Sequence, residues 1–141
     1  MFDHRITPAL VAAAFGWLAT PLASAAEYYV RPTGNDTNNG LSPQSAFRSL
    51  NAACRATPAG KHTIRVAPGE YDETESCILP PGVSLRGAGI GKTIFHWKAV
   101  RSLDENPMKI DFSGFLIQMK DSSDASISGL TIIGNLPDDQ R

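Results

Sequence analysis

The feature that most constrains the fold is a series of short β-prone segments, each closed by glycine or proline. From residue 62 onward, apolar and polar residues alternate over a few positions and then stop at Pro-Gly or Gly-Ala-Gly breaks. Alternation with a period of two predicts strands that bury one face. The expected strands are 28–31, 63–66, 76–79, 83–86, 93–97, 115–119, 125–127 and 130–133.

One helix is predicted between the first strand and this series. Ser42 followed by Pro43 has the pattern of an N-cap and a first helical residue, and the helix should run to about Ala56. Pro58 and Gly60 would end it. Its apolar stripe consists of Phe47, Leu50, Ala53 and Cys54. The fold class is therefore all-β, with a single short helix near the N-terminus.

The spacing of the strands favours a solenoid. Ile64 and Val83 are 19 residues apart and Val83 and Ile127 are 44 apart, which is about two steps of 22. A β-sandwich would more often show tight two-residue turns such as Asn-Gly. We therefore predict a right-handed parallel β-helix, with an N-terminal cap over 26–61 and about three rungs over 62–141. Residues 98–114 are interpreted as a loop inserted into one rung.

The first 25 residues predict export. An apolar stretch at 9–18 is too short to span a bilayer comfortably, and it precedes the small residues Ala23-Ser24-Ala25-Ala26. This pattern predicts a signal peptide cleaved after Ala25 or Ala26, and a short membrane anchor is the alternative. The mature chain is expected to be secreted or periplasmic and free of the membrane.

Charge and cysteine content limit the partners. The net charge is −1 and the chain has no lysine or arginine cluster, so neither nucleic acid nor an anionic membrane is an expected partner. Cys54 and Cys77 are the two cysteines. In an exported chain they are expected to form a disulfide, with two buried thiols as the alternative. No Cys-x-x-Cys or histidine cluster is present, so no metal site is assigned.

Three local motifs have a structural and a functional interpretation. Residues 87–93 resemble a phosphate loop, but Arg86 stands where that motif requires glycine and a strand follows, so a corner is expected. Residues 36–40 alternate oxygen ligands but lack the distal glutamate of a calcium loop, and an Asx-rich turn is expected with Ca²⁺ as the alternative. The acidic residues of 70–75 are expected to form a solvated corner, with cation binding as the alternative.

Two further sets of side chains have a bearing on sugar binding. Tyr71, Phe95 and Trp97 are expected in the core, with stacking on sugar rings as the alternative. Arg65 and Arg86 occupy outward positions of alternating strands. If the strands are in register, these arginines line one face and can pair with sugar carboxylates. The alternative is a solvated surface without a ligand.

Several longer motifs carry a family resemblance. They are Tyr28-Tyr29-Val30-x-Pro32-x-Gly34-Asn35-Asp36, Thr63-Ile64-x-Val66-x-Pro68-Gly69-x-Tyr71, Val83-Ser84-Leu85-x-Gly87-x-Gly89 and Ile127-x-Gly129-Leu130-Thr131-Ile132. The chain resembles secreted, pectate-lyase-like parallel β-helix proteins that begin with a DUF1565-type cap.

The resemblance implies action on polysaccharides by lyase, hydrolase or esterase chemistry. It also implies Ca²⁺ as a cofactor of full-length relatives, and catalytic groups on middle rungs. No residue here matches their catalytic motifs, so catalytic and substrate-binding residues are not assigned and enzymatic activity is left open. A non-catalytic carbohydrate-binding or adhesin-like protein is the alternative.

The C-terminal end of the solenoid is expected to be open. Each rung buries its inner face against the next, so a last rung at 130–133 would expose apolar side chains. Self-association through this open end is therefore expected. A truncated reading frame that stops before the catalytic rungs is the simplest explanation of the length.

Overall fold

A computed structural model describes residues 24–98, 115–121 and 123–134, and strands dominate these ranges. The predicted signal peptide lies almost entirely outside them, as does the loop predicted at 98–114. No helix in the described ranges is long and apolar enough to cross a membrane. The elements are β1 (Glu27–Val30), η1 (Pro43–Ser45), α1 (Leu50–Ala56), β2 (Thr63–Val66), β3 (Gly69–Glu73), β4 (Cys77–Leu79), β5 (Ser84–Arg86), β6 (Thr93–Trp97), β7 (Ile117–Met119), β8 (Ser126–Ser128) and β9 (Thr131–Gly134).

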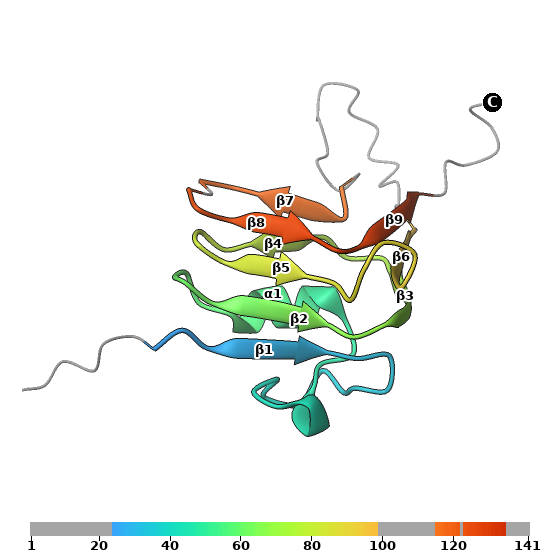
Figure 1. Ribbon diagram of the computed structural model, residues 1–141, viewed down its shortest axis with the longest axis horizontal. Coiled ribbons are helices and arrows are strands. Elements are labelled where there is room, and N and C mark those ends of the chain that lie inside the picture. Colours follow the sequence, from blue (N-terminus) through green and yellow to red (C-terminus); the bar gives the residue numbers. More distant parts are fainter. Residues whose placement is uncertain (1–23, 99–114, 122, 135–141) are drawn as a thin grey trace, which may run out of the picture.

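The strands form three parallel sheets, in the orders β1-β2-β5-β8, β3-β6-β9 and β4-β7. The chain enters the sheets in turn: β2, β3 and β4 each belong to a different sheet, and β5, β6 and β7 repeat the same order. Figure 1 shows the strands of the first sheet lying one above another from β1 to β8. The prediction of a mostly β chain with parallel pairing is confirmed.

Inward side chains of neighbouring strands follow one another in register. Ile64 is opposite Leu85, which is opposite Ile127, and Phe95 occupies the corresponding inward position of β6. One buried apolar cluster joins residues of all three sheets and α1. The alignment of Ile64 with Val83 that the spacing predicted is wrong. The residue opposite Ile64 is Leu85, and Val83 lies just before β5.

The predicted helix is divided into two pieces. Ser42 caps η1, whose C-cap Ala46 has an extended backbone with φ −66° and ψ 150°. Phe47 then forms a parallel bridge with Val30, and α1 begins only after the N-cap Ser49, whose side chain accepts from Ala52 N. The expected continuous helix is therefore wrong at its N-terminal half, because pairing with β1 removes Phe47 from the helix.

The loop after β1 covers the outer edge of that strand. Tyr29 N donates to Gly40 O at 2.8 Å, Phe47 N donates to Tyr29 O at 2.8 Å, and Arg31 N donates to Phe47 O at 2.9 Å. Gly40 has φ 70° and packs directly on the Phe47 ring, where a Cβ would lie 2.1 Å from a ring carbon. The backbone groups at this end of the sheet are thus used within the chain.

Helix α1 is fastened to β4 and the residue before it. Cys54 and Cys77 form a disulfide with a Cα–Cα distance of 5.6 Å. The Asn51 side-chain amide donates to Ser76 O at 2.7 Å. Both cysteines are buried in the core. These links hold the helix beside β4, where it forms one wall of the groove described below.

Strand β3 was not expected from the sequence. The break at Pro68-Gly69 and the acidic residues after it predict a corner, yet Gly69–Glu73 pairs along its length with β6. Tyr71 and Glu73 point inward while Glu70 and Asp72 are exposed. The predicted solvated corner is therefore wrong for Glu73, whose side chain is 3% exposed.

Candidate functional site

The outer face of the β1-β2-β5-β8 sheet carries one continuous row of polar side chains. Tyr29 lies opposite Arg65, Arg65 opposite Arg86, and Arg86 opposite Ser128. Neighbouring strands of a sheet lie about 4.8 Å apart, so the two arginines start from adjacent backbone positions. We call Tyr29, Arg65, Arg86 and Ser128 the arginine row. The structure brings together the two arginines that the sequence placed at outward positions.

Glu27 offsets part of the positive charge of the row. Its Oε1 accepts from Arg65 Nε at 2.8 Å and lies 2.7 Å from Arg65 Nη2. The Tyr29 hydroxyl donates to Glu27 Oε2 at 2.8 Å. These hydrogen bonds, first from Arg65 and then from Tyr29, hold the pKa of Glu27 below its ordinary value. Arg86 adds a weaker Coulombic contribution in the same direction.

Arg86 keeps its hydrogen-bonding capacity. It is exposed, and within the described part of the chain its guanidinium makes no hydrogen bond or ion pair. A second row beside it is lined by hydroxyl groups, since Thr63, Ser84 and Ser126 follow one another in register. The Ser126 hydroxyl donates to Ser84 Oγ at 3.0 Å. The face therefore offers guanidinium, hydroxyl and phenol groups side by side.

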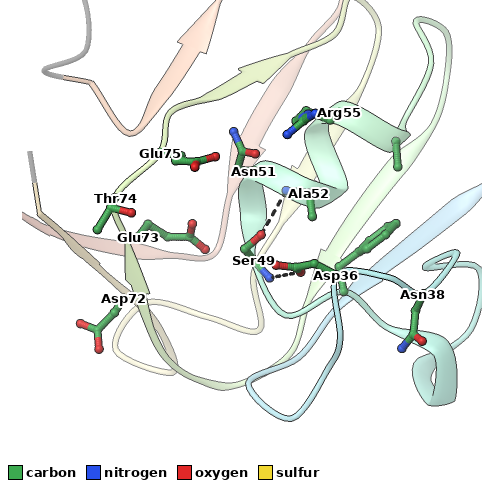
Figure 2. Close-up of a pocket in the computed structure, with 12 residues that line it drawn as sticks. Asp36, Asn38, Ser49, Asn51, Ala52, Arg55, Asp72, Glu73, Thr74 and Glu75 are labelled. Atoms are coloured by element: carbon green, nitrogen blue, oxygen red, sulfur yellow. Dashed lines mark hydrogen bonds between the residues drawn. The ribbon is translucent and has the colours of Figure 1, made fainter. Parts of the chain in front are cut away.

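A polar groove runs between α1 and the end of β3. Its main cavity has a volume of about 680 Å³, and we call it the helix groove. Figure 2 shows Asn51 and Arg55 on the helix side, with Glu73 and Glu75 pointing toward the helix and Asp72 pointing away. The groove is lined by Asp36, Asn38, Phe47, Ser49, Asn51, Ala52, Arg55, Ala56, Asp72, Glu73, Thr74 and Glu75.

Two carboxylates of the helix groove serve the start of α1. Asp36 Oδ1 accepts from Arg48 N and from Ser49 N, each at 2.8 Å. Glu73 Oε1 accepts from Leu50 N at 2.7 Å. The first backbone N–H groups of a helix have no partner within the helix. Asp36 and Glu73 therefore act as acceptors that fix the helix on the sheets.

Glu73 has a perturbed pKa. Burial raises the pKa of this carboxyl from 4.5 to about 7, and the hydrogen bond from Leu50 N opposes that effect. The negative charges of Asp36 and Glu75 raise the pKa further. The sequence signal for this residue is the alternation within β3, where position 73 shares the inward side with Tyr71.

The other acidic residues of 70–75 are at the surface. His96 Nε2 lies 3.3 Å from Glu70 Oε2, and Lys98 Nζ lies 3.1 Å from Asp72 Oδ1. All four side chains project from the outer face of β3 and β6 or from the residue after β6. On this face each of the two carboxylates therefore lies near a histidine or lysine nitrogen.

The Asx-rich loop uses its oxygens within the cap. Asn35 Oδ1 accepts from Thr37 N at 3.0 Å, and Asn39 Oδ1 accepts from Leu41 N at 3.0 Å and from Ser45 Oγ at 2.8 Å. In the described ranges, no group of three or more His, Cys, Asp or Glu side chains is arranged to hold a metal ion. The loop shapes the cap through turns, as expected of Asx residues.

The remaining candidates of the sequence lie in structural positions. Tyr71, Phe95 and Trp97 are all buried in the core, and the Tyr71 and Phe95 rings lie 5.1 Å apart. Residues 87–93 lead into strand β6, with Ala88 N donating to Thr93 Oγ1 at 2.9 Å. A phosphate loop would instead open a helix. The aromatic residues thus contribute to the core, and residues 87–93 form the turn that leads into β6.

Comparison with known proteins identifies one family. The model of the family described as Protein of unknown function (DUF1565) matches residues 32–136. Neither the curated proteins nor the solved structures contain a match to the chain.

Proposed function

The chain belongs to the DUF1565 family, and from this premise we propose that it is an exported, pectate-lyase-like parallel β-helix protein that binds acidic polysaccharides through the arginine row. In this proposal residues 26–61 form the cap and the residues after them form the first coils. We propose a binding role for this face, because its carboxylate, Glu27, is held by Arg65 and Tyr29, whereas glycoside hydrolysis uses a pair of carboxylates.

The β-helix proposal is supported by the path of the chain. From β2 onward, successive strands belong to three different sheets in a fixed order. The strands β2 to β6 each pair in parallel with the strand numbered three higher, from β2 with β5 to β6 with β9. Coils of a solenoid that bury their inner faces on one another would produce this pattern. The apolar cluster shared by the three sheets also fits such coils.

The ligand class is supported by the charge and geometry of the arginine row. The main observation is that the Arg86 guanidinium is exposed and available for a ligand. Glu27 engages Arg65, whereas Arg86 remains exposed and unpaired within the described residues. A guanidinium pairs with a carboxylate through two parallel hydrogen bonds. The adjacent hydroxyls of Ser84 and Ser126 suit a ligand rich in hydroxyl groups.

Export is supported by two features. The first residues have the pattern of a cleavable signal. The Cys54–Cys77 disulfide is of the kind that persists in oxidising compartments. Polysaccharides of walls and extracellular matrices would be available to a chain in that location.

The test is affinity electrophoresis through gels that contain polygalacturonate, its methyl-esterified form, or a neutral galactan. Polygalacturonate should retard the protein, whereas the other two polymers should not, because esterification removes the carboxylate. Arg86→Gln should weaken binding about tenfold, as expected for one charged hydrogen-bonded pair, and added salt should weaken it further.

Arg55→Gln is the matched control, because it removes the same charge from α1, away from the row. Equal retardation by all three polymers would overturn the proposal. An equal loss in Arg55→Gln and Arg86→Gln would also overturn it, since it would indicate attraction by overall charge.

A further inference from the structure

Beyond the arginine row, we infer that the helix groove is a second binding site, which holds a short neutral oligosaccharide through hydrogen bonds to its hydroxyl groups. The groove lies between α1 and the end of β3 and has a volume of about 680 Å³. Small-molecule sites commonly have volumes of about 300–1,000 Å³. The arginine row is separate from this groove, because it lies on the β1-β2-β5-β8 sheet.

The two walls of the groove are fixed by contacts within the chain. The Cys54–Cys77 disulfide and the hydrogen bond from the Asn51 side chain to Ser76 O hold α1 beside β4. Strand β3, which forms the opposite wall, is paired along its length with β6. A site built on fixed walls loses less conformational entropy on binding than a site that must first be ordered.

Some side chains of the groove have one polar atom engaged and another one free. Asp36 Oδ1, Glu73 Oε1 and the Asn51 side-chain nitrogen make the hydrogen bonds given above. Among the residues that the structure describes, Asp36 Oδ2, Glu73 Oε2 and Asn51 Oδ1 have no hydrogen-bond or ion-pair partner. One atom thus orients each side chain, and the other stays available to a ligand.

Glu73 Oε2 is the most informative of these free atoms. The residue is only 3% exposed, and Figure 2 shows its side chain pointing toward α1. Over the described ranges, no fully enclosed side-chain oxygen or nitrogen lacks a hydrogen bond. Because Oε2 has no partner, it must be reachable from the groove, where a ligand can supply the hydrogen bond that a buried polar group requires.

The mixture of groups in the groove favours a ligand rich in hydroxyl groups. Arg55 offers N–H donors, Asp36 offers an acceptor, and Thr74 offers a hydroxyl group. Burial raises the pKa of Glu73 to about 7, so this carboxyl is present with and without its proton near neutral pH. A hydroxyl group both donates and accepts, and it can therefore pair with all of these groups and with either state of Glu73.

The charge of the groove is unsuited to the uronate polymer proposed for the arginine row. The carboxylates of Asp36, Glu73 and Glu75 line the groove together with the single guanidinium of Arg55. Like charges brought together on binding cost free energy. A neutral sugar avoids this cost, so the two sites should take different ligands.

The shape of the groove suits several linked sugar rings. A second cavity, of about 340 Å³, adjoins it and extends along β3 to Glu70. The residues that line both cavities are Asp36, Ser49, Asp72 and Glu73. The two cavities therefore form one elongated depression, with Glu73 where they meet.

The test is a titration of the ¹⁵N-labelled full chain with cellotetraose and with xylotetraose, followed by NMR. At least one of these neutral sugars should shift the amide signals of Asn51, Arg55 and Thr74 in a saturable way, and the signals of Arg86 and Ser128 should not move. Since the one aromatic ring that lines the groove, Phe47, is itself buried, the Kd should be on the order of 1 mM. Such binding is too weak to retard the protein in a gel that contains a dilute neutral polymer.

Two variants separate the groove from the arginine row. Arg55→Gln should raise the Kd for the neutral tetramer about tenfold, as expected for the loss of one charged hydrogen bond, and should leave retardation by polygalacturonate unchanged. Arg86→Gln removes the same charge from another sheet and should have the opposite pattern. A failure of either site is thus visible without the other.

Any of four results would overturn the proposal. The first is the absence of shifts with both neutral tetramers up to their solubility limits. The second is that tetragalacturonate binds more tightly than the neutral tetramers at the same amides. The third is that a fully deacetylated chitosan tetramer binds more tightly there, which would indicate a site for ammonium groups. The fourth is an equal loss of binding in Arg55→Gln and Arg86→Gln.

Discussion

Replacing Glu73 with glutamine should change how the stability of the protein depends on pH. Glu73 is buried against the start of α1, and its Oε1 accepts from Leu50 N. Burial raises the pKa of this carboxyl from 4.5 to about 7. Glutamine has nearly the same shape and keeps an oxygen that can accept from Leu50 N, but it cannot ionise.

The direction of the effect follows from the two pKa values of Glu73. Below pH 4.5 the carboxyl is protonated in the folded and the unfolded chain, so its stabilising effect is complete. Between pH 4.5 and about 7 the unfolded chain loses the proton first, which favours unfolding. Each tenfold difference in proton affinity corresponds to about 1.4 kcal/mol. The free energy of unfolding should therefore fall by about 3 kcal/mol over this range and then level off.

The assay is urea unfolding, followed by circular dichroism, at several pH values from 4 to 8. Glu73→Gln should match the wild type near pH 4 and exceed its stability by about 3 kcal/mol at pH 8. Glu70→Gln is the control, because Glu70 lies on the same strand with a side chain that is 73% exposed. A wild type whose stability rises with pH between 5 and 7, or a Glu73→Gln variant that is less stable at pH 8, would refute the reasoning.

Two further predictions concern the packing of the chain. Replacing both Cys54 and Cys77 with alanine should lower the free energy of unfolding by about 3 kcal/mol, because the disulfide closes a loop over a sequence separation of 23. Urea unfolding without reductant measures this free energy, and a loss below about 1 kcal/mol would contradict the prediction. Gly87→Ala should destabilise by more than about 2 kcal/mol, since its Cβ would lie 2.1 Å from Gly129 O. Gly134→Ala, where a Cβ would meet no atom within 4 Å, should change the melting temperature little, and equal losses in the two glycine variants would disprove the close approach.

Period-two alternation made most strands predictable, and it failed where an inward position is polar. Ile64 and Leu85 stand in alternating segments that read directly as half-buried strands. In β3 the inward position 73 is a glutamate, so composition suggested a surface corner. The acceptor role that makes burial tolerable depends on Leu50 N, which is 23 residues away in the sequence.

The helix predicted from the sequence begins too early for a related reason. Phe47 fits the apolar stripe of that predicted helix, and its side chain is buried as the stripe predicts. Its backbone, however, pairs with β1 through Val30 and Tyr29. Local periodicity predicts which side chains are buried, whereas competition between a helix and a strand edge is decided by tertiary contacts.

The site was predictable only in part. Outward positions for Arg65 and Arg86 follow from alternation within their own strands. Their adjacency depends on the register between β2 and β5. The pairing of Arg65 with Glu27 spans 38 residues and has no local signal.

The register between β2 and β5 is the basis of the arginine row, and a cysteine cross-link tests it most directly. Thr63 and Ser84 are paired across these strands. A double variant with Thr63→Cys and Ser84→Cys should therefore form a new disulfide on oxidation, and peptide mapping should identify it in addition to the native Cys54–Cys77 disulfide. Thr63→Cys with Arg86→Cys is displaced by two residues, which places the Cα atoms about 8 Å apart, beyond the usual range for a disulfide. Cross-linking of the first pair alone is the predicted result; cross-linking of the second pair alone, or of neither, would contradict the account.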